Sequence, residues 1–581
     1  MSPPLVAVEF LTSRLKIQAD EIAVRNHHVT EMTGITHVYC KQTIGGFEVA
    51  NGDIDVHVSK DGQVVAYGDS FFKSAAARHK LRRRADIWSS EQSGPIAEPK
   101  AAFATFATHI GQSPDAGRMA VVPVDSAASG TQQTYLIKGV PFVDRDVSAV
   151  RALIQTSEGT LAPAWEFKVH MPRNYFHAFV SADGKRLLSL VDWVASASYR
   201  VVKLGNNNPA DTPRELVDNP ADATASPAGW HDQGTRRFTT TIGNNVYAQE
   251  NLNGTASWEM NRRPDGGSKL VFDYPYEASK PPADNMNASI TNLFYMNNIM
   301  HDIFYHYGFT EATGNFQENN WGKGGRGGDA VKANAIDGDG TDNAEFETPP
   351  DGERPQMRMF AFTATKPSRD GDLENDIVSH EYGHGISNRL TGGPDNADCL
   401  PDGQAAGMGE GWSDFFAYWL EMKRADTPAK HVEMGKYVVG RNIRTYPYAT
   451  DMKSNPLTFG QLLEPGWDEP HRMGEVWAVM LYDMYWNLVA KLGFSENRYV
   501  ADPTKGNTLA LKLVMDALKL QVCRPNFVNA RDAILQAEQM LTGGKHRCDI
   551  WRAFAKRGLG EGAKAADSIV TSTKMPQNCN A

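Results

Sequence analysis

The sequence predicts an α+β protein in which a strand-rich first part is followed by a mainly helical last part. Up to about residue 194, short β-branched runs alternate with turn signals, which is typical of antiparallel strands. Beyond residue 373, apolar residues recur at the three- and four-residue spacing of helices. Between these parts, residues 203–229 are rich in Pro, Asp, Ala and Ser, as linkers and domain starts are. We therefore expect a domain boundary near residue 196.

The first part contains two groups of predicted strands. Gly-Gly at 45–46, Asn-Gly at 51–52 and Asp-Gly at 61–62 are hairpin signals in the first group, and Asp-Gly at 183–184 is the signal in the second. The expected strands are residues 35–41, 47–49, 54–58 and 63–67, then 133–137, 165–171, 176–181 and 187–191.

The later part is predicted to begin with one long helix and to end in several more. Residues 288–307 carry apolar side chains at helical spacing, and a Gly-rich loop at 322–328 and a hairpin region up to residue 362 follow. The further expected helices are residues 376–390, 409–423, 474–492, 508–520 and 527–541.

Charge and hydropathy argue against two classes of function. The net charge of −10 disfavours a nucleic-acid-binding protein, and the compact basic run at 80–84 is typical of a solvated face. No apolar stretch is long enough to span a membrane, because residues 478–492 are interrupted by Asp483, Asn487 and Lys491.

Five cysteines are too few for a disulfide scaffold. Cys399, Cys523, Cys548 and Cys579 lie in the last third, where one or two bridges in any of three full pairings are compatible with the sequence. Cys40 is expected to be a buried free thiol.

The segment that carries chemistry is His380-Glu381-Tyr382-Gly383-His384, inside the predicted helix 376–390. Histidines four residues apart lie on one helix face, where both can bind one Zn²⁺, and the intervening Glu can take a proton from a metal-activated water. The alternative is a surface helix with two histidines. Gly383 and Gly385 favour the first interpretation, because mid-helix glycines are costly unless close packing requires them.

A second motif offers the third metal ligand that the His-Glu-x-x-His segment does not contain. Glu410 follows His384 by 26 residues and lies in the next predicted helix. A catalytic zinc needs three protein ligands and one open position, so Glu410 is the candidate third ligand. Asp414, one helical turn further, is placed to accept a hydrogen bond from a ligating histidine and to orient it.

The strings around these residues resemble the fungalysin family of secreted metallopeptidases, which is related to thermolysin. The resemblance rests first on residues 380–394 and on the string GMGEGWSD at 407–414, and it extends over nearly the whole chain. Residues 34–43 are similar to the propeptide module of that family. Further similar strings are residues 348–352, 357–359, 369–372, 526–535 and 553–560.

The resemblance implies a zymogen with a two-lobed peptidase. A propeptide that assists folding and blocks the cleft would span residues 1–195, and the mature N-terminus would fall within 194–203. The N-terminal catalytic lobe, which includes the zinc helix, would span 196–390, and the helical C-terminal lobe 391–581. By the same resemblance one Zn²⁺ per chain is held by His380, His384 and Glu410, with Glu381 as the general base.

The resemblance also assigns His471 to the stabilisation of the tetrahedral intermediate. The residues alone are equally compatible with a histidine at a helix start, and either Asp468 or Glu469 could orient it. Thermolysin-like enzymes also use a tyrosine shortly before the third ligand. Residues 399–408 contain none, so that contribution is missing or comes from elsewhere, with Tyr446 or Tyr448 as candidates.

Three substrate contacts and a second metal are implied less directly. Asn343 and Ala344 resemble the edge segment that binds an extended substrate, although an ordinary turn explains them too. Arg444 has the spacing of an arginine that binds a substrate carbonyl, and a surface arginine is the alternative. Asp376 and Glu421 resemble a thermolysin-type Ca²⁺ site, although surface charges are commoner.

We therefore expect a zinc endopeptidase precursor that acts as a monomer on protein or peptide substrates, with its own propeptide as inhibitor and with no nucleic acid or membrane span. The family implies secretion, whereas the first nine residues lack the pattern of a signal peptide. Asn253 and Asn287 begin glycosylation sequons, which matter only in an exported chain. The competing hypothesis is a non-catalytic, zinc-stabilised relative, which would be expected to lack the base or a ligand.

Overall fold

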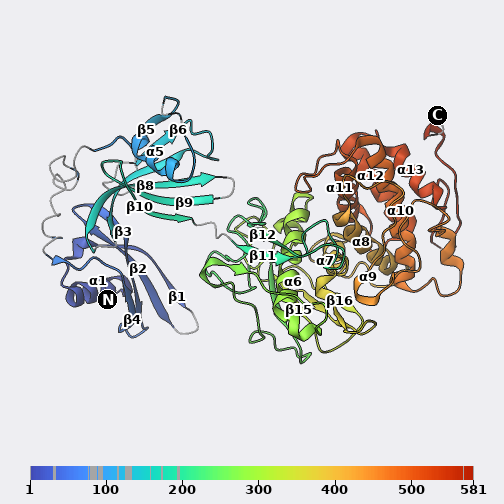
Figure 1. The fold of residues 1–581 in the computed structure, drawn as a ribbon, viewed down its shortest axis with the longest axis horizontal. Helices are drawn as coiled ribbons and strands as arrows, with labels where there is room; N and C mark the ends of the chain where they lie inside the picture. Colours follow the sequence, from blue (N-terminus) through green and yellow to red (C-terminus); the bar gives the residue numbers. More distant parts are fainter. Residues whose placement is uncertain are drawn as a thin grey trace. The chain divides into compact units, whose positions relative to one another are not determined.

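The computed structural model describes residues 2–30, 34–75, 78, 88, 96–113, 115, 117–124, 134–156, 159–171, 174–192, 197–566 and 568–579. The chain forms two compact units, Met1–Val194 and Ala195–Ala581 (Figure 1). Each unit has its own hydrophobic core. Strands dominate the first unit and helices dominate the end of the second, so the α+β class predicted from the sequence is confirmed.

The first unit is built on one mixed sheet with the order β1-β2-β3-β7-β8-β9-β10, to which β4 adds beside β3, β6 beside β7 and β5 beside β6. Most neighbours are antiparallel, and the β3–β7 pair is parallel. Its elements are α1 (Pro3–Leu15), β1 (Ile22–Thr30), β2 (Ile35–Ile44), β3 (Phe47–Val58), β4 (Val64–Asp69), α5 (Pro99–His109), β5 (Ala120–Val124), β6 (Thr134–Lys138), β7 (Val147–Gln155), β8 (Leu161–Met171), β9 (Asn174–Ser181) and β10 (Leu187–Asp192).

Two helices cover this sheet. α1 packs on β2 and β3, where Val38 and Cys40 are buried and alternate with the more exposed His37 and Tyr39. α5 packs on β8 and β9 through aromatic side chains of its own. Cys40 is a buried free thiol, as the sequence predicts, and burial raises its pKa to about 11.

One predicted hairpin is wrong. Residues 47–49 and 54–58 belong to the single strand β3, which continues through the Asn-Gly signal at 51–52. Asn51 does not form a turn because its side-chain amide bonds the backbone of Gln155 on β7 in both directions, at 3.0 and 2.9 Å. β3 therefore stays paired with β2 on both sides of the Asn-Gly signal, while its other edge pairs with β7 at Val49 and with β4 from Ile54 onward.

The second unit begins with short strands around a long helix. β13, β15, β17 and β16 form a four-stranded sheet in that order, and α6 packs on β13 and β15. The elements before the metal-binding motif are β11 (Ser198–Val201), β12 (Glu215–Asp218), β13 (Val246–Glu250), β14 (Val271–Phe272), α6 (Met286–His306), β15 (Val331–Ala335), β16 (Ala344–Glu347), β17 (Gln356–Met359), β18 (Ala361–Phe362) and β19 (Arg369–Asp370).

The remainder is helical. Its helices are α7 (Asn375–Leu390), α8 (Gly403–Glu421), α9 (Lys436–Val439), α10 (Pro470–Leu492), α11 (Gly506–Leu520), α12 (Phe527–Thr542) and α13 (Arg547–Lys556). α8 begins six residues before its predicted start, since its glycine-rich first turns carry little helical signal. α1, α5, α9 and α13 were not predicted, whereas α7 begins within one residue of its expected start. In the part of the chain that the structure describes, no helix is long and apolar enough to cross a membrane.

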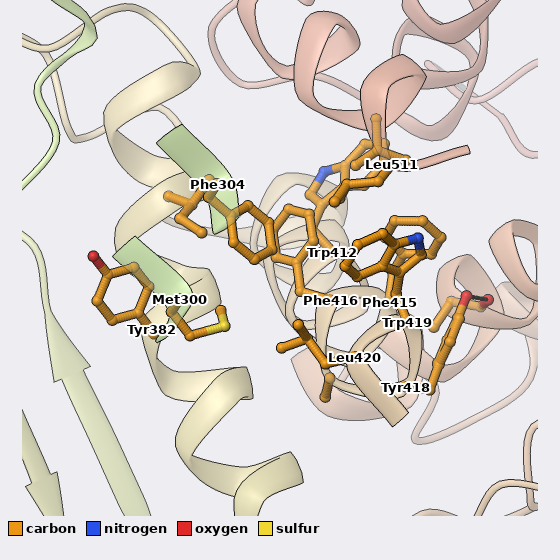
Figure 2. Packing of buried hydrophobic residues seen from close by; sticks show 14 of the residues in the cluster. Met300, Phe304, Tyr382, Trp412, Phe415, Phe416, Tyr418, Trp419, Leu420 and Leu511 are labelled. Carbon is orange, nitrogen blue, oxygen red and sulfur yellow. Dashed lines mark hydrogen bonds between the residues drawn. The ribbon is translucent and has the colours of Figure 1, made fainter. Parts of the chain in front are cut away.

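Aromatic and aliphatic side chains of α6, α7, α8 and α11 share one hydrophobic core. Figure 2 shows Phe304 of α6 beside Phe416 of α8, and the two ring centroids are 4.9 Å apart. Tyr382 of α7 is fully buried on the opposite side of its helix from the histidines. The helix that carries the motif is thus fixed within a rigid core.

Two disulfides close the C-terminal region. Cys399 is bonded to Cys523 and Cys548 to Cys579, which is one of the three pairings compatible with the sequence. The first bridge ties the loop before α8 to the segment between α11 and α12.

Candidate metal centre and active site

Two helices bring three potential metal ligands together. His380 and His384 are one turn apart on α7, their ring centroids are 4.7 Å apart, and their Nε2 atoms are 3.1 Å apart. Glu410 of α8 places Oε2 3.1 Å from His380 Nε2 and Oε1 3.6 Å from His384 Nε2. Among the described residues this is the one group of three or more such side chains able to hold a metal ion.

Glycines allow the helices to approach closely enough for this. A Cβ on Gly383 would lie 2.9 Å from Ser413 Oγ, and a Cβ on Gly474 would lie 2.5 Å from Glu410 Cβ. The close packing inferred from the sequence at Gly383 and Gly385 is confirmed, since a Cβ on Gly385 would meet Phe316 at 2.7 Å. The carboxylate of Glu410 is positioned by backbone contact between α7, α8 and α10.

Asp414 determines the orientation of His380. Its Oδ1 accepts from His380 Nδ1 at 2.7 Å, so Nε2 is left facing Glu410. Arg444 donates to both carboxylate oxygens, at 2.7 and 2.8 Å, and the Tyr448 hydroxyl also donates to Oδ2. Burial would raise the pKa of Asp414, but Arg444 and His380 hold it far below the usual range.

The three ligand candidates are strongly coupled to one another. Burial lowers the pKa of His384 to about 4, whereas for His380 the hydrogen bonds to Asp414 and Glu410 outweigh burial and raise the pKa to about 10. The pKa of Glu410 stays far below normal despite burial, because the two histidines face it. Two imidazole nitrogens and one carboxylate that converge in this way match the donor set of a catalytic zinc, and a bound dication would replace the proton they share.

Glu381 lies beside this group at an open cavity of about 930 Å³. Its side chain is buried, and burial raises its pKa to about 7. A cation held by the neighbouring ligands would oppose this rise. The residues that line the cavity are Asp342, Asn343, Ala344, Glu345, Phe346, Phe362, Ile377, His380, Glu381, His384, Asn388, Glu410, Met434, Val439, Arg441, Ile443, Arg444, Thr445, Glu469, His471, Arg472 and Glu475.

His471 opens α10 at the edge of the same cavity. Its Nδ1 lies 2.6 Å from Glu469 Oε1, and its Nε2 lies 3.5 Å from Glu410 Oε2. Of the two candidate partners, Glu469 and not Asp468 makes this contact. Because the carboxylate accepts from Nδ1, the other nitrogen points toward the metal ligands while the side chain stays 54% exposed.

The candidate substrate-binding residues also line the cavity. Asn343 precedes and Ala344 begins β16, the edge strand of its sheet, so unpaired backbone groups are available there. Arg444 reaches the cavity, although its guanidinium is buried and paired with Asp414. Neither of the alternative tyrosines lines the cavity: Tyr448 is buried against Asp414, and Tyr446 packs on the core.

Sequence reasoning missed two contacts that support the site, although it named Tyr448 for another role. Tyr448 is a third donor to Asp414. Glu475 Oε1 accepts from the Thr445 backbone and hydroxyl at 2.9 and 3.0 Å, which holds the loop that carries Arg444. No motif marks either residue, because their partners lie 30 or more positions away.

A helix-borne His-Glu-x-x-His motif, with a carboxylate on the following helix and an open cavity in front, defines a metal-dependent peptidase. The sequence model of the fungalysin metallopeptidases (M36) matches residues 198–563, and the fungalysin/thermolysin propeptide motif matches residues 20–71. The chain belongs to the fungalysin family and is a metalloendopeptidase with a propeptide motif.

Curated relatives agree with this family. The chain is 42% identical to the extracellular metalloproteinase mep of Aspergillus fumigatus over 588 residues, which covers 99% of the chain and 89% of the relative. It is 39% identical to extracellular metalloproteinase 2 of Arthroderma otae, with 96% and 86% covered. Among solved structures, the precursor of protealysin from Serratia proteamaculans aligns with 55% of the chain and 88% of its own at 12% identity and a TM-score of 0.34.

Proposed function

We propose that this protein is a zinc endopeptidase in which His380, His384 and Glu410 hold one Zn²⁺ per chain. The observation that supports this most strongly is the convergence of the three ligand atoms beside Glu381 at an open cavity. Zinc, when bound, supplies Lewis acidity toward water and the peptide carbonyl. The donor set fits Zn²⁺ because it combines two imidazoles with one carboxylate and leaves one side open.

The side chains of the chain then move the protons. Glu381 takes a proton from the attacking water and passes it to the leaving amine, which its place between the ligands and the cavity allows. His471, with Glu469 holding Nδ1, donates from Nε2 to the oxyanion as the carbonyl becomes tetrahedral. Asp414 keeps His380 in the tautomer that can bind metal.

Substrates are proteins or peptides bound as an added strand. An extended segment would pair with the β16 edge near Asn343 and Ala344, and Arg444 would contact a substrate carbonyl from the other side of the cavity. The relatives that carry the word extracellular in their names support secretion of this chain. We further propose that residues 1–195 are an inhibitory propeptide, that residues 196–390 and 391–581 are the two catalytic lobes, and that the enzyme acts as a monomer.

The intact mass over time tests the activity, the base and the boundary together. Zinc-loaded wild-type protein is expected to convert to a species that starts near residue 196, while Glu381→Gln stays at full length with zinc retained. If both samples stay at full length, added protease should release casein-cleaving activity from the wild type alone. Failure of that second step would favour a non-catalytic, zinc-stabilised relative.

Calcium is proposed at one further position, between α7 and α8. Asp376 Oδ1 and Glu421 Oε1 are buried without a hydrogen-bond partner and border a cavity of about 10 Å³ together with Asn206. Two orphan carboxylate oxygens suit a hard cation, with backbone or water oxygens as the remaining ligands. Ca²⁺ should raise the thermal midpoint of Glu381→Gln protein, and an added Asp376→Asn should abolish that rise.

A further inference from the structure

A second pair of histidines lies in the first unit, far along the chain from the catalytic motif. His37 on β2 and His57 on β3 are direct cross-strand partners. Their Nδ1 atoms are 2.8 Å apart, and their ring centroids are 4.7 Å apart at an interplanar angle of 71°. Each nitrogen therefore points at the other.

This geometry closely resembles that of the catalytic pair. The rings of His380 and His384 are also 4.7 Å apart, at 84°, with 3.1 Å between the facing nitrogens. Two nitrogens bound at zinc distances of about 2.0–2.1 Å in tetrahedral geometry are about 3.3 Å apart. Widening the His37–His57 contact by about 0.5 Å, with a tilt of the rings that turns both Nδ1 lone pairs toward a common point, would therefore admit an ion.

A carboxylate orients this pair as it orients the catalytic one. Asp55 Oδ2 lies 2.9 Å from His57 Nε2 and accepts a hydrogen bond from it. In the neutral ring the Nδ1 lone pair of His57 then faces His37. Asp414 performs the same task for His380 at 2.7 Å, with the two ring nitrogens exchanged.

The pair is also accessible. β2 turns Val38 and Cys40 into the core, which leaves His37 on the other face of the sheet. The side chains of His57 and Asp55 are 26% and 40% exposed, so water can complete the coordination of an ion.

We propose that His37 and His57, oriented by Asp55, form a site for a divalent transition metal such as Zn²⁺. Imidazole ligands of this kind favour zinc, copper and nickel over calcium or magnesium. A bound ion would clamp β2 to β3 within the unit that carries the propeptide motif. The site is independent of the catalytic one and does not depend on the proposed function.

Zinc stoichiometry of the full chain tests the proposal. Glu381→Gln protein, chosen to prevent self-cleavage, is stripped with a chelator and dialysed against graded free Zn²⁺, and bound zinc per chain is measured by elemental mass spectrometry. Two ions are expected, of which the weaker is lost on adding His37→Gln or His57→Gln, with at least a tenfold rise in the zinc concentration required. His109→Gln is the matched control, because His109 is an exposed histidine at the end of α5.

Asp55→Asn keeps both imidazoles and removes only the orienting carboxylate. It should weaken the second ion by about tenfold while circular dichroism stays unchanged. The proposal is overturned if the parent protein binds a single ion over the whole range and that ion survives both histidine changes. It is equally overturned if the second ion survives both histidine changes in folded protein.

Discussion

The α7–α8 pair carries buried carboxylates at two places, Asp414 beside the catalytic cavity and Asp376 at the start of α7, and their pKa values are shifted in opposite directions. Asp414 and Asp376 are both almost completely inaccessible to solvent. Burial would raise the pKa of each, yet Arg444 and His380 hold that of Asp414 far below normal, whereas that of Asp376 rises to about 6. The partners of Asp376 Oδ2 are neutral: the Asn207 amide and the Gly435 backbone, both at 2.9 Å.

Neighbouring charge, and not depth of burial, therefore decides whether Asp414 and Asp376 are protonated. Beside the catalytic cavity, His380 and His384 lower the pKa of Glu410, and Arg444 and His380 lower that of Asp414. Both carboxylates therefore stay ionised. At the second place, burial and the charge of Asp376 raise the pKa of both Glu374 and Glu421, the latter to about 8. That place holds protons, or a cation, and should affect stability more than activity.

The largest expected effect is on kcat/KM, which should fall when Glu381 is changed and stay nearly constant when Glu374 is changed. Glu381→Gln should lower kcat/KM by about four orders of magnitude or more, since it removes the proton acceptor while leaving zinc in place. Glu374→Gln, near Asp376, should keep kcat/KM within about threefold. Casein or peptide hydrolysis by the processed enzyme measures both, and comparable losses in the two variants would break the comparison.

Removing the charge of Asp414 should lower both the stability of the protein and its affinity for zinc. Asp414→Asn leaves the buried Arg444 without its counter-charge, so the free energy of unfolding should fall by about 3–5 kcal/mol. Zinc affinity should fall by about 10- to 100-fold, because the orientation of His380 is lost. Urea unfolding and competition with a zinc chelator measure the two effects. Unchanged zinc affinity would contradict the role assigned to Asp414.

Glu421, which has a raised pKa, should make the stability of the protein depend on pH. Because the pKa of Glu421 in the folded state, about 8, lies above its unfolded value, the folded protein holds a proton that the unfolded chain releases between these values. Stability should therefore fall as pH rises from about 5 to about 8. Glu421→Gln should remove this loss, which amounts to about 4 kcal/mol of unfolding free energy at pH 8 and to less than about 1 kcal/mol at pH 5.

Urea titrations in a calcium chelator measure this difference. Glu496→Gln is the control, because Glu496 is an exposed partner of Arg424. Parallel pH profiles for Glu421→Gln and the wild type would show that Glu421 is not the proton-holding group.

The smallest expected effect is the difference in unfolding free energy between removing one or the other of two buried tyrosine hydroxyls. Tyr448 donates to the charged Asp414, whereas Tyr418 donates to the backbone carbonyl of Ala478 at 3.1 Å. Tyr448→Phe should cost about 2 kcal/mol of unfolding free energy and Tyr418→Phe about 1 kcal/mol, since a charged acceptor strengthens the bond. Chemical denaturation gives both values. Equal costs would mean that the charge of Asp414 is already fully compensated without Tyr448.

The sequence by itself determined the α+β class, the fungalysin family and the local spacing of the motif. α7 could be placed to within one residue, and His380 and His384 assigned to one face, because helical hydrogen bonding and side-chain periodicity are local properties of a few turns. The close packing at Gly383 followed from the same local reasoning. These features depend on residues that are neighbours in the chain.

Only the tertiary structure decided which distant groups meet. It paired Cys399 with Cys523, carried β3 straight through its turn signal, and chose Glu469 as the partner of His471. It also placed Tyr448 on Asp414 and left Asp376 Oδ1 without a hydrogen-bond partner. Such choices depend on the packing of segments separated by tens to hundreds of residues, where no local period or propensity carries the information.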